Sequence, residues 1–215
     1  MVAQAGLLTA MSGGVTVFGG QGMEFWFEFA STYSYLSVMR IEKAAEQAGV
    51  DVAWKPLMLG PIFGAQGWTD SPFNIYPAKG RFMWRDMERR AQALGLPFRQ
   101  PPGFPQHTVM AARVAYLALQ QNGGRDFVRA LYHAQFADGQ NVAEPEVVGA
   151  ALNEAGLPVR LIDEAQAPEV KAALRAQVDD AQQKGIFGAP SFVVGEELFW
   201  GDDQLEMALE WAGRL

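Results

Sequence analysis

Cysteine is absent from the 215-residue sequence, which excludes disulfide bridges, thiolate metal ligands and a cysteine nucleophile. Histidine is scarce: His107 and His133 lie in separate segments without the spacing of metal ligands, so we expect both to be structural and predict no metal site. Lys and Arg number 17 against 24 Asp and Glu, and the net charge of −7 argues against nucleic acid or an anionic membrane surface as main partner. Apolar runs long enough to span a membrane, about 18 residues, are also lacking.

The apolar residues that are present, 49% of the chain, are enough for one or two compact domains with a core. Residues 1–22 carry no Lys or Arg before their short apolar stretch, so they do not fit the pattern of a signal peptide. Glycines cluster in the second half of this stretch. We therefore expect a flexible leader, a folded protein that begins at Met23, and a cytoplasmic location.

The folded part opens with a strand, a helix and a second strand. Residues 23–30 form an aromatic-rich run typical of a buried strand. Across residues 35–48 apolar side chains recur with helical spacing, and Gly49 supplies a stop. Residues 50–58 predict a second strand, and a right-handed crossover makes such a pair parallel.

The middle of the chain differs in character. Residues 60–80 are rich in Gly, Pro and Asn and predict a long loop that carries function. Helical patterns then follow one another at 81–94, 108–121, 125–137, 144–155 and 168–184.

The last segment returns to strands. SFVV at 191–194, and ELFW after a Gly-Glu turn, predict a β-hairpin, and Asp202 caps a final helix. Without the helical block the order is βαβ–ββα, so the predicted fold class is α/β: a thioredoxin-like fold with a large all-helical insertion. We assign residues 23–58 plus 186–215 to the thioredoxin-like domain and 59–185 to the helical insertion domain.

The junction of the first strand and the first helix carries Ser31-Thr32-Tyr33-Ser34. A helix N-terminus stabilises a nearby anion, and thioredoxin-like proteins place a Cys-x-x-Cys motif there. Serines fill both cysteine positions here. Ser31 is a poor nucleophile without a base, but its hydroxyl can donate a hydrogen bond to a thiolate that a ligand supplies; alternatively, Ser31 is only an N-cap.

Two short stretches near the C-terminus are also candidates. The Ala189–Pro190 bond precedes a strand; a cis bond would expose the Ala189 backbone to an extended peptide, whereas the alternative is a simple turn before an edge strand. Asp202 and Asp203 stand at a helix start, where they cap the helix or bind an α-ammonium group. One carboxylate is enough for the cap, so Asp203 is the better ligand candidate.

A cationic set occurs in this otherwise acidic protein. Lys79, Arg81 and Arg85 are concentrated enough to bind a carboxylate-bearing ligand, although ordinary solvated side chains are the alternative for each. The tryptophans Trp26, Trp84 and Trp200 are expected to be core or pocket wall rather than a cofactor site.

Together these stretches resemble the 2-hydroxychromene-2-carboxylate isomerase family, a DsbA-like group close to the kappa-class glutathione transferases. The resemblance extends over residues 23–215 and rests on these motifs: FEFASTYSYL (27–36), WKPLMLG (54–60), SPFNIYPAKGRFMWRDMER (71–89) and FGAPSFVVGEELFWGDD (187–203). It implies a thioredoxin domain interrupted by a helical domain, a homodimer, and glutathione as cofactor.

The resemblance also implies roles for individual residues. The catalytic serine falls on Ser31, and Asn74 contacts the tripeptide from the interdomain loop. Ala189, before a cis-Pro190, pairs with the cysteinyl backbone. Asp202 and Asp203 hold the γ-glutamyl end. The sequence departs from the family at two places, with Thr32 where Pro is usual and Gln204 where Arg often follows the aspartate.

The implied activity is glutathione-dependent cis-trans isomerisation of 2-hydroxychromene-2-carboxylate-type intermediates of aromatic degradation, in which a thiolate adds reversibly to the substrate. Lys79, Arg81 or Arg85 would hold the substrate carboxylate. A kappa-like transferase that conjugates electrophiles needs the same thiolate and is the first alternative. A non-catalytic thioredoxin-like binding module is the second, whereas a disulfide oxidoreductase is excluded by the absence of cysteine.

Overall fold

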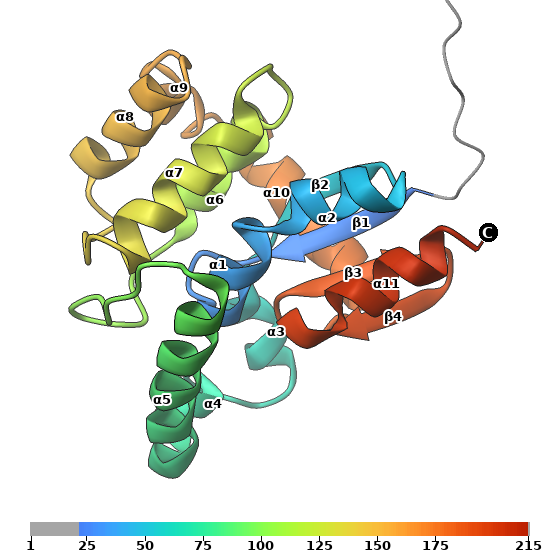
Figure 1. The fold of residues 1–215 in the computed structure, drawn as a ribbon. Coiled ribbons are helices and arrows are strands. Elements are labelled where there is room, and N and C mark those ends of the chain that lie inside the picture. Colours follow the sequence, from blue (N-terminus) through green and yellow to red (C-terminus); the bar gives the residue numbers. More distant parts are fainter. Residues whose placement is uncertain (1–21, 215) are drawn as a thin grey trace, which may run out of the picture.

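The computed structural model describes residues 22–214, so nearly all of the predicted leader, residues 1–22, lies outside the described residues. Four strands form one mixed sheet in the order β2-β1-β3-β4 (Figure 1). They are β1 (Met23–Phe27), β2 (Val52–Pro56), β3 (Ser191–Val194) and β4 (Glu197–Trp200). As predicted, β1 and β2 are parallel and β3 and β4 form an antiparallel hairpin. The two halves join where β3 pairs antiparallel with β1.

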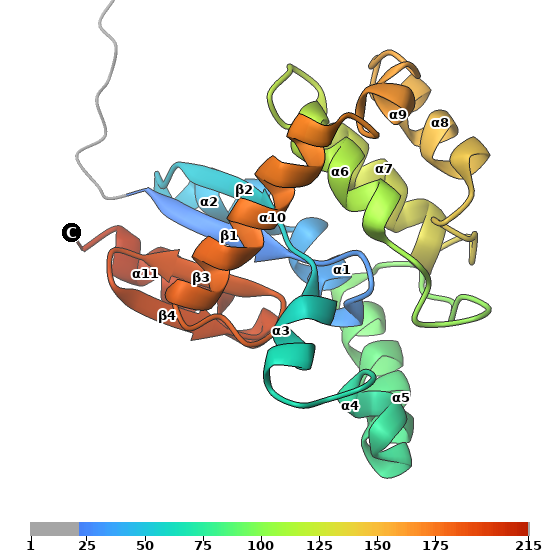
Figure 2. The same cartoon turned by 180° about the vertical axis from the view of Figure 1, so that it is seen from behind.

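Helices cover both faces of this sheet. Phe25 and Phe27 of β1 and Phe192 of β3 point into the core on one face. That face is covered by α2 (Ile41–Ala48) and α11 (Leu205–Ala212), which follows the short 3-10 helix η1 (Asp202–Gln204). Trp26 of β1 points to the opposite face, where α10 (Pro168–Gln183) lies across the strands (Figure 2). The central strands β1 and β3 are therefore buried on both sides, which explains why they have so few polar side chains.

The first helical segment differs from the prediction of one helix over residues 35–48. It consists of α1 (Thr32–Val38) and α2, separated at Met39 and Arg40. The helix begins earlier because Ser31 caps it: the Ser34 backbone N–H donates to Ser31 Oγ at 3.2 Å. Gly49 ends α2 in a left-handed conformation with φ of 67°, as expected for a glycine stop.

The predicted loop over residues 60–80 is wrong. This segment contains most of α3 (Leu59–Ala65), all of α4 (Pro72–Ile75) and the start of α5 (Pro77–Leu94). Pro72 and Pro77 are first-turn residues of α4 and α5 rather than breakers, and Ser71 Oγ accepts from the Phe73 N–H as a cap.

Five helices complete the insertion. They are α6 (Val109–Ala118), α7 (Gly124–Phe136), α8 (Pro145–Glu154), the unpredicted short α9 (Leu161–Glu164), and α10. The core of the sheet continues into this block, because Phe29 packs against Tyr132 of α7 with ring centroids 4.9 Å apart. The division at residues 59 and 185 stays a prediction. Within the described residues no helix is both long and apolar enough to cross a membrane.

Candidate active site around Ser31

Ser31 stands where β1 has ended and α1 begins. A tight turn places it there, with the Ser31 N–H donating to the Glu28 carbonyl at 2.8 Å. The side chain is 8% exposed, and its Oγ donates to the carbonyl oxygen of Ala189 at 2.7 Å while accepting from the Ser34 N–H. The hydroxyl therefore bridges the start of α1 and the segment before β3.

The segment before β3 is held against this turn. The Ala189–Pro190 peptide bond is cis, as the resemblance implies. Ser191 Oγ donates to the Gly188 carbonyl at 2.8 Å, and the Gly201 N–H donates to the Pro190 carbonyl at 3.0 Å. In the part of the chain that the structure describes, the Ala189 N–H donates to no other residue. Ala189 thus offers a peptide backbone beside the Ser31 hydroxyl.

The two neighbouring aspartates differ sharply in environment. Asp202 is 5% exposed, and its Oδ1 accepts from Ser37 Oγ at 2.8 Å and from Arg40 Nη2 at 3.0 Å. Asp202 therefore holds η1 against the junction of α1 and α2. Asp203 is exposed and leans over Gly201, where a methyl group added to the glycine would lie 2.7 Å from Asp203 Oδ1. Of the two, Asp203 has the carboxylate that a ligand can reach.

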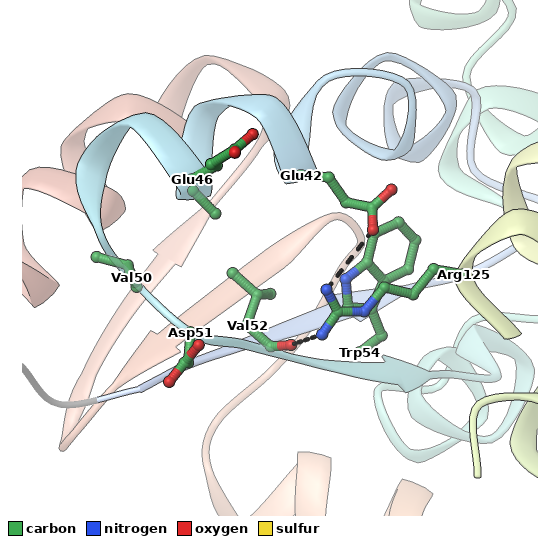
Figure 3. A pocket seen from close by; sticks show the side chains of 8 residues that line it. Glu42, Glu46, Val50, Asp51, Val52, Trp54 and Arg125 are labelled. Carbon is green, nitrogen blue, oxygen red and sulfur yellow. Dashed lines mark hydrogen bonds and ion pairs between the residues drawn. The ribbon is translucent and has the colours of Figure 1, made fainter. Parts of the chain in front are cut away.

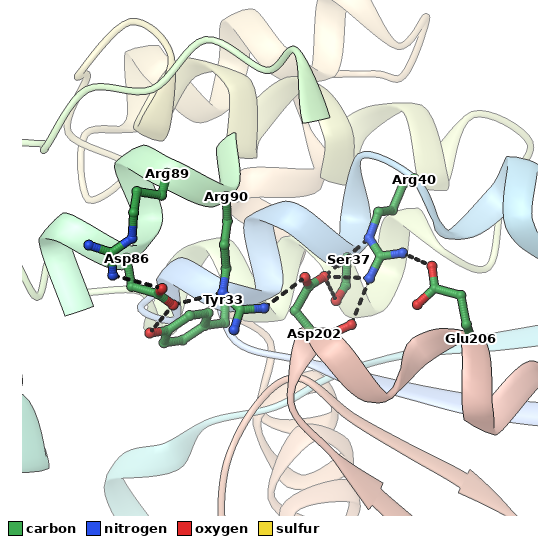
Figure 4. A network of polar contacts seen from close by, with 8 residues as sticks. All are labelled: Tyr33, Ser37, Arg40, Asp86, Arg89, Arg90, Asp202 and Glu206. Carbon is green, nitrogen blue, oxygen red and sulfur yellow. Dashed lines mark hydrogen bonds and ion pairs between the residues drawn. The ribbon is translucent and has the colours of Figure 1, made fainter. Parts of the chain in front are cut away.

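A network that sequence reasoning missed links α5 to this region (Figure 4). Asp86 Oδ2 accepts from the Tyr33 hydroxyl at 3.1 Å and from Arg90 Nε at 2.7 Å. The Arg90 guanidinium lies over the Tyr33 ring at 5.8 Å, and its Nη1 is 4.0 Å from Asp202 Oδ2. Burial, helped by Asp86, raises the pKa of Tyr33 to about 12, so its hydroxyl stays protonated at neutral pH. The only sequence signal was the i,i+4 spacing of Asp86 and Arg90.

A second missed group is the buried carboxylate of Glu28, 3% exposed. It accepts from Thr108 Oγ1 at 2.6 Å, the Leu59 N–H at 2.8 Å and the Ala30 N–H at 3.3 Å. These bonds tie the Ser31 turn to the starts of α3 and α6. Burial raises the pKa of Glu28 despite the three hydrogen bonds, which act in the opposite direction.

Comparison with known proteins identifies the family. The family model of the DSBA-like thioredoxin domain matches residues 23–210. The chain belongs to this family. It is 27% identical over 186 residues to a 2-hydroxychromene-2-carboxylate isomerase from Sphingobium xenophagum, covering 86% of this chain and 94% of the relative. It is 29% identical over 189 residues to glutathione S-transferase kappa 2 from Caenorhabditis elegans, covering 78% of each.

Among solved structures, a 2-hydroxychromene-2-carboxylate isomerase superposes with a TM-score of 0.78 at 23% identity, over 89% of this chain and 94% of that one. The predicted thioredoxin-like fold with helical insertion is confirmed. So is the resemblance to the isomerases and kappa-class transferases within the DSBA-like family.

The remaining predicted site residues of this DSBA-like protein lie on α4 and α5 and are exposed. Asn74 Nδ2 donates to both carboxylate oxygens of Asp70 at 3.1 Å, and Lys79 lies over the Tyr76 ring at 4.8 Å. Arg85 pairs with Glu88, and Arg81 is exposed on the same helix. Within residues 22–214, no hydrogen bond or ion pair joins these four side chains to the Ser31 turn. Their predicted roles stay predictions.

The tryptophans divide between core and surface. Trp26 is fully buried under α10, and Trp84 packs against Phe104 with ring centroids 4.9 Å apart. Trp200 is 52% exposed, packs against Phe187 and lies so close to Gly188 that a methyl group there would clash with the indole nitrogen. It is therefore the one of the three that stands beside the segment holding Ala189.

A cavity of about 260 Å³ lies away from this site, between α2, β2 and α7 (Figure 3). Its lining residues are Glu42, Ala45, Glu46, Val50, Asp51, Val52, Trp54 and Arg125. Arg125 donates to the Val52 carbonyl at 3.0 Å and pairs with Glu42 at 3.6 Å. None of the predicted site residues lines it.

Proposed function

We propose that the protein is a glutathione-dependent isomerase of 2-hydroxychromene-2-carboxylate-type aromatic intermediates, in which Ser31 stabilises the glutathione thiolate. The observation that carries the proposal is the position of Ser31 Oγ, 2.7 Å from the carbonyl of Ala189. A chain without cysteine must receive its reactive sulfur from a ligand, and this hydroxyl stands beside a backbone that an extended peptide can pair with.

The residues present fit such a tripeptide. The Ala189 N–H, which has no partner among the described residues, can donate to the cysteinyl carbonyl. The cysteinyl N–H can donate to the Ala189 carbonyl and so replace the Ser31 hydroxyl there. Ser31 is then free to turn its hydrogen to the sulfur while Oγ still accepts from the Ser34 N–H. Every donor and acceptor keeps a partner in this exchange.

When bound, glutathione would supply a thiolate whose addition converts the conjugated double bond of the substrate into a single bond that can rotate, and whose elimination restores the double bond and the free thiolate. The chain's own contribution is to keep that sulfur negative and to orient the two molecules. We assign Asn74, Asp202 and Asp203 to the binding of the tripeptide. The role of Asp202 is indirect, because it fixes the position of η1. Lys79, Arg81 and Arg85 are proposed to hold the substrate carboxylate. From the resemblance we also propose a cytoplasmic homodimer.

The test follows the absorbance of 2-hydroxychromene-2-carboxylate with and without glutathione, with free thiol measured in parallel. We expect isomerisation that requires glutathione and leaves the thiol concentration unchanged. Consumption of thiol in the presence of 1-chloro-2,4-dinitrobenzene, without isomerisation, would instead favour a kappa-like transferase; the 29% identity to glutathione S-transferase kappa 2 makes this the second candidate. Glutathione binding without either reaction would indicate a non-catalytic module.

A further inference from the structure

Arg90 of α5 reaches out of the helical insertion to the start of η1 (Figure 4). Only its Nε is used by Asp86, in the hydrogen bond at 2.7 Å. Its Nη1 is 4.0 Å from Asp202 Oδ2, too far for a hydrogen bond, and within residues 22–214 neither Nη1 nor Nη2 donates to another group. The side chain is 37% exposed. Arg90 is thus held by Asp86 and by a longer ion pair with Asp202, while the hydrogens of Nη1 and Nη2 can still be donated to a ligand.

Two chains of contacts connect this guanidinium to Ser31. Tyr33, on which Arg90 stacks, follows Ser31 by two residues in α1. In the other direction, Ser31 donates to Ala189, and the adjacent Pro190 carbonyl accepts from Gly201, which immediately precedes η1. Arg90 therefore contacts α1 and lies beside η1, two elements that are both linked to the Ser31 hydroxyl.

The opposite charge in this region comes from Asp203. Partial burial lowers the pKa of Arg90, but Asp86 and, more weakly, Asp203 outweigh it and raise the pKa overall; Asp203 also acts on Tyr33. The geometry agrees, because Asp202 Oδ2 lies 4.0 Å from Arg90 Nη1 and the exposed Asp203 is the next residue of η1. The third residue of η1, Gln204, is neutral, so η1 itself offers no cation. Arg40 is already occupied by Asp202 and Glu206.

We propose that Arg90 and Asp203 together form a receptor for an α-amino acid terminus, with the guanidinium binding the α-carboxylate and Asp203 binding the α-ammonium group. The inference rests on the proposed function, where the ligand is the γ-glutamyl end of glutathione, and it adds a specificity-determining residue from the inserted helix. A paired cation and anion recognise a zwitterion better than either singly charged analogue. The Asp86 hydrogen bond and the Tyr33 ring hold the guanidinium in place, which reduces the entropy lost on binding.

Arg89 provides a matched control. It neighbours Arg90 on α5 and pairs with the same carboxylate, Asp86, at 3.2 Å. Its guanidinium, however, lies over Phe82 at 5.8 Å, whereas that of Arg90 lies over Tyr33. Arg89→Gln therefore removes the same charge and a bond to the same partner without removing the proposed ligand contact.

The experiment is calorimetric titration of wild type, Arg90→Gln, Arg89→Gln and Asp203→Asn with three peptides. These are glutathione, glutaryl-Cys-Gly, which lacks the α-ammonium group, and 4-aminobutanoyl-Cys-Gly, which lacks the α-carboxylate. Arg90→Gln should weaken the binding of glutathione and of glutaryl-Cys-Gly on the order of tenfold, and it should leave the affinity for 4-aminobutanoyl-Cys-Gly unchanged. Asp203→Asn should instead weaken the binding of glutathione and of 4-aminobutanoyl-Cys-Gly. Arg89→Gln should change none of the three affinities more than about twofold.

Two results would contradict the proposed receptor without contradicting glutathione binding. One is that Arg90→Gln weakens the binding of all three peptides equally, and the other is that Arg90→Gln and Arg89→Gln have equal effects. Failure of the wild type to bind glutathione would overturn the proposed function and the receptor with it. Thermal unfolding of each variant checks the fold. Should Arg90→Gln unfold, Arg90→Lys replaces it: this variant keeps the charge and loses the planar fork, so it should weaken only the two peptides that carry the carboxylate.

Discussion

Ser31 Oγ and the carbonyl oxygen of Ala189 lie 2.7 Å apart, although 158 residues separate the two in the chain. Most of the intervening residues form the helical insertion, whose α5 and α10 pack back onto the parts of the chain that flank this bond. The insertion thus does more than interrupt the sheet. Its helix α5 supplies Asp86 and Arg90 beside the Ser31 turn, and its helix α10 covers one face of the sheet.

We expect Ser31→Ala to lower the turnover rate of the isomerisation by roughly a hundredfold, which is the usual effect of removing one hydrogen-bond donor that stabilises an anion in an active site. The variant also loses an N-cap, which costs about 1 kcal/mol of stability. Steady-state kinetics measures the first effect and urea unfolding the second. A direct readout is the titration of bound glutathione by thiolate absorbance, which should move to higher pH in the variant.

Ser34→Ala is the comparison for that experiment. It removes a buried hydroxyl three residues away but keeps the Ser34 backbone N–H that donates to Ser31 Oγ. Turnover should therefore fall by no more than a few fold. If both substitutions reduced turnover to the same extent, the assignment of Ser31 as the thiolate's donor would be wrong.

The strands and the Ser31 cap were predictable because each depends on chemistry within a few residues. The cis Ala189–Pro190 bond followed only from the family resemblance, because the local residues are equally compatible with a simple turn. An aromatic-rich run with little turn chemistry formed β1, and Ser31 followed the N-cap preference. The segment 60–80 was misread for a local reason as well. Its prolines are compatible with both a loop and the first turn of a helix, and in the folded protein they occupy the first turns of α4 and α5, which tertiary packing stabilises.

The polar groups around Ser31 were not predictable in the same way. Glu28 lies in an aromatic strand pattern, and only the fold brings Thr108 and Leu59 to its carboxylate. Arg90 belongs to a charged helix whose surface looks uniformly solvated in sequence. Its role depends on the approach of α5 to α1 and η1, which no local pattern encodes.

Asp202 and Asp203 should respond in opposite ways to substitution. Asp202→Ala leaves Ser37 and Arg40 without their shared acceptor at a nearly buried site, and we expect a loss of about 2 kcal/mol in the free energy of unfolding. Asp203→Ala removes an exposed carboxylate and should change stability by less than about 0.5 kcal/mol. Urea unfolding of both variants at neutral pH provides the comparison. Equal destabilisation would contradict the division between a structural and a ligand-facing carboxylate.

Glu28 predicts a pH dependence of stability. Its pKa in the folded protein is raised above the ordinary value of 4.5, chiefly by burial. Between the two values the unfolded chain has released a proton that the folded chain still holds, so stability declines as the pH rises through that window. Relative to wild type, Glu28→Gln should therefore gain stability with rising pH, by up to about 1.4 kcal/mol per pH unit within the window.

Urea unfolding at intervals from pH 4.5 to pH 8 measures this difference. Glu46→Gln, which removes an exposed carboxylate of α2, is the matched control for loss of one charge. A difference between Glu28→Gln and wild type that stayed constant over the whole range would show that Glu28 does not titrate in that window.

Gly80 of α5 tests whether the position of α4 matters for the ligand. A methyl group at Gly80 would lie 2.5 Å from the carbonyl oxygen of Phe73, so Gly80→Ala must push the α4 backbone away from α5. Such overpacking costs roughly 1–3 kcal/mol. Because Asn74 is the next residue along α4, the displacement should also weaken glutathione binding severalfold. Gly64→Ala on α3 is the control: nothing lies within 4 Å of its methyl group, and it should leave binding unchanged and stabilise its helix by up to about 1 kcal/mol. If glutathione bound equally well to both variants, Asn74 would not be part of the tripeptide site.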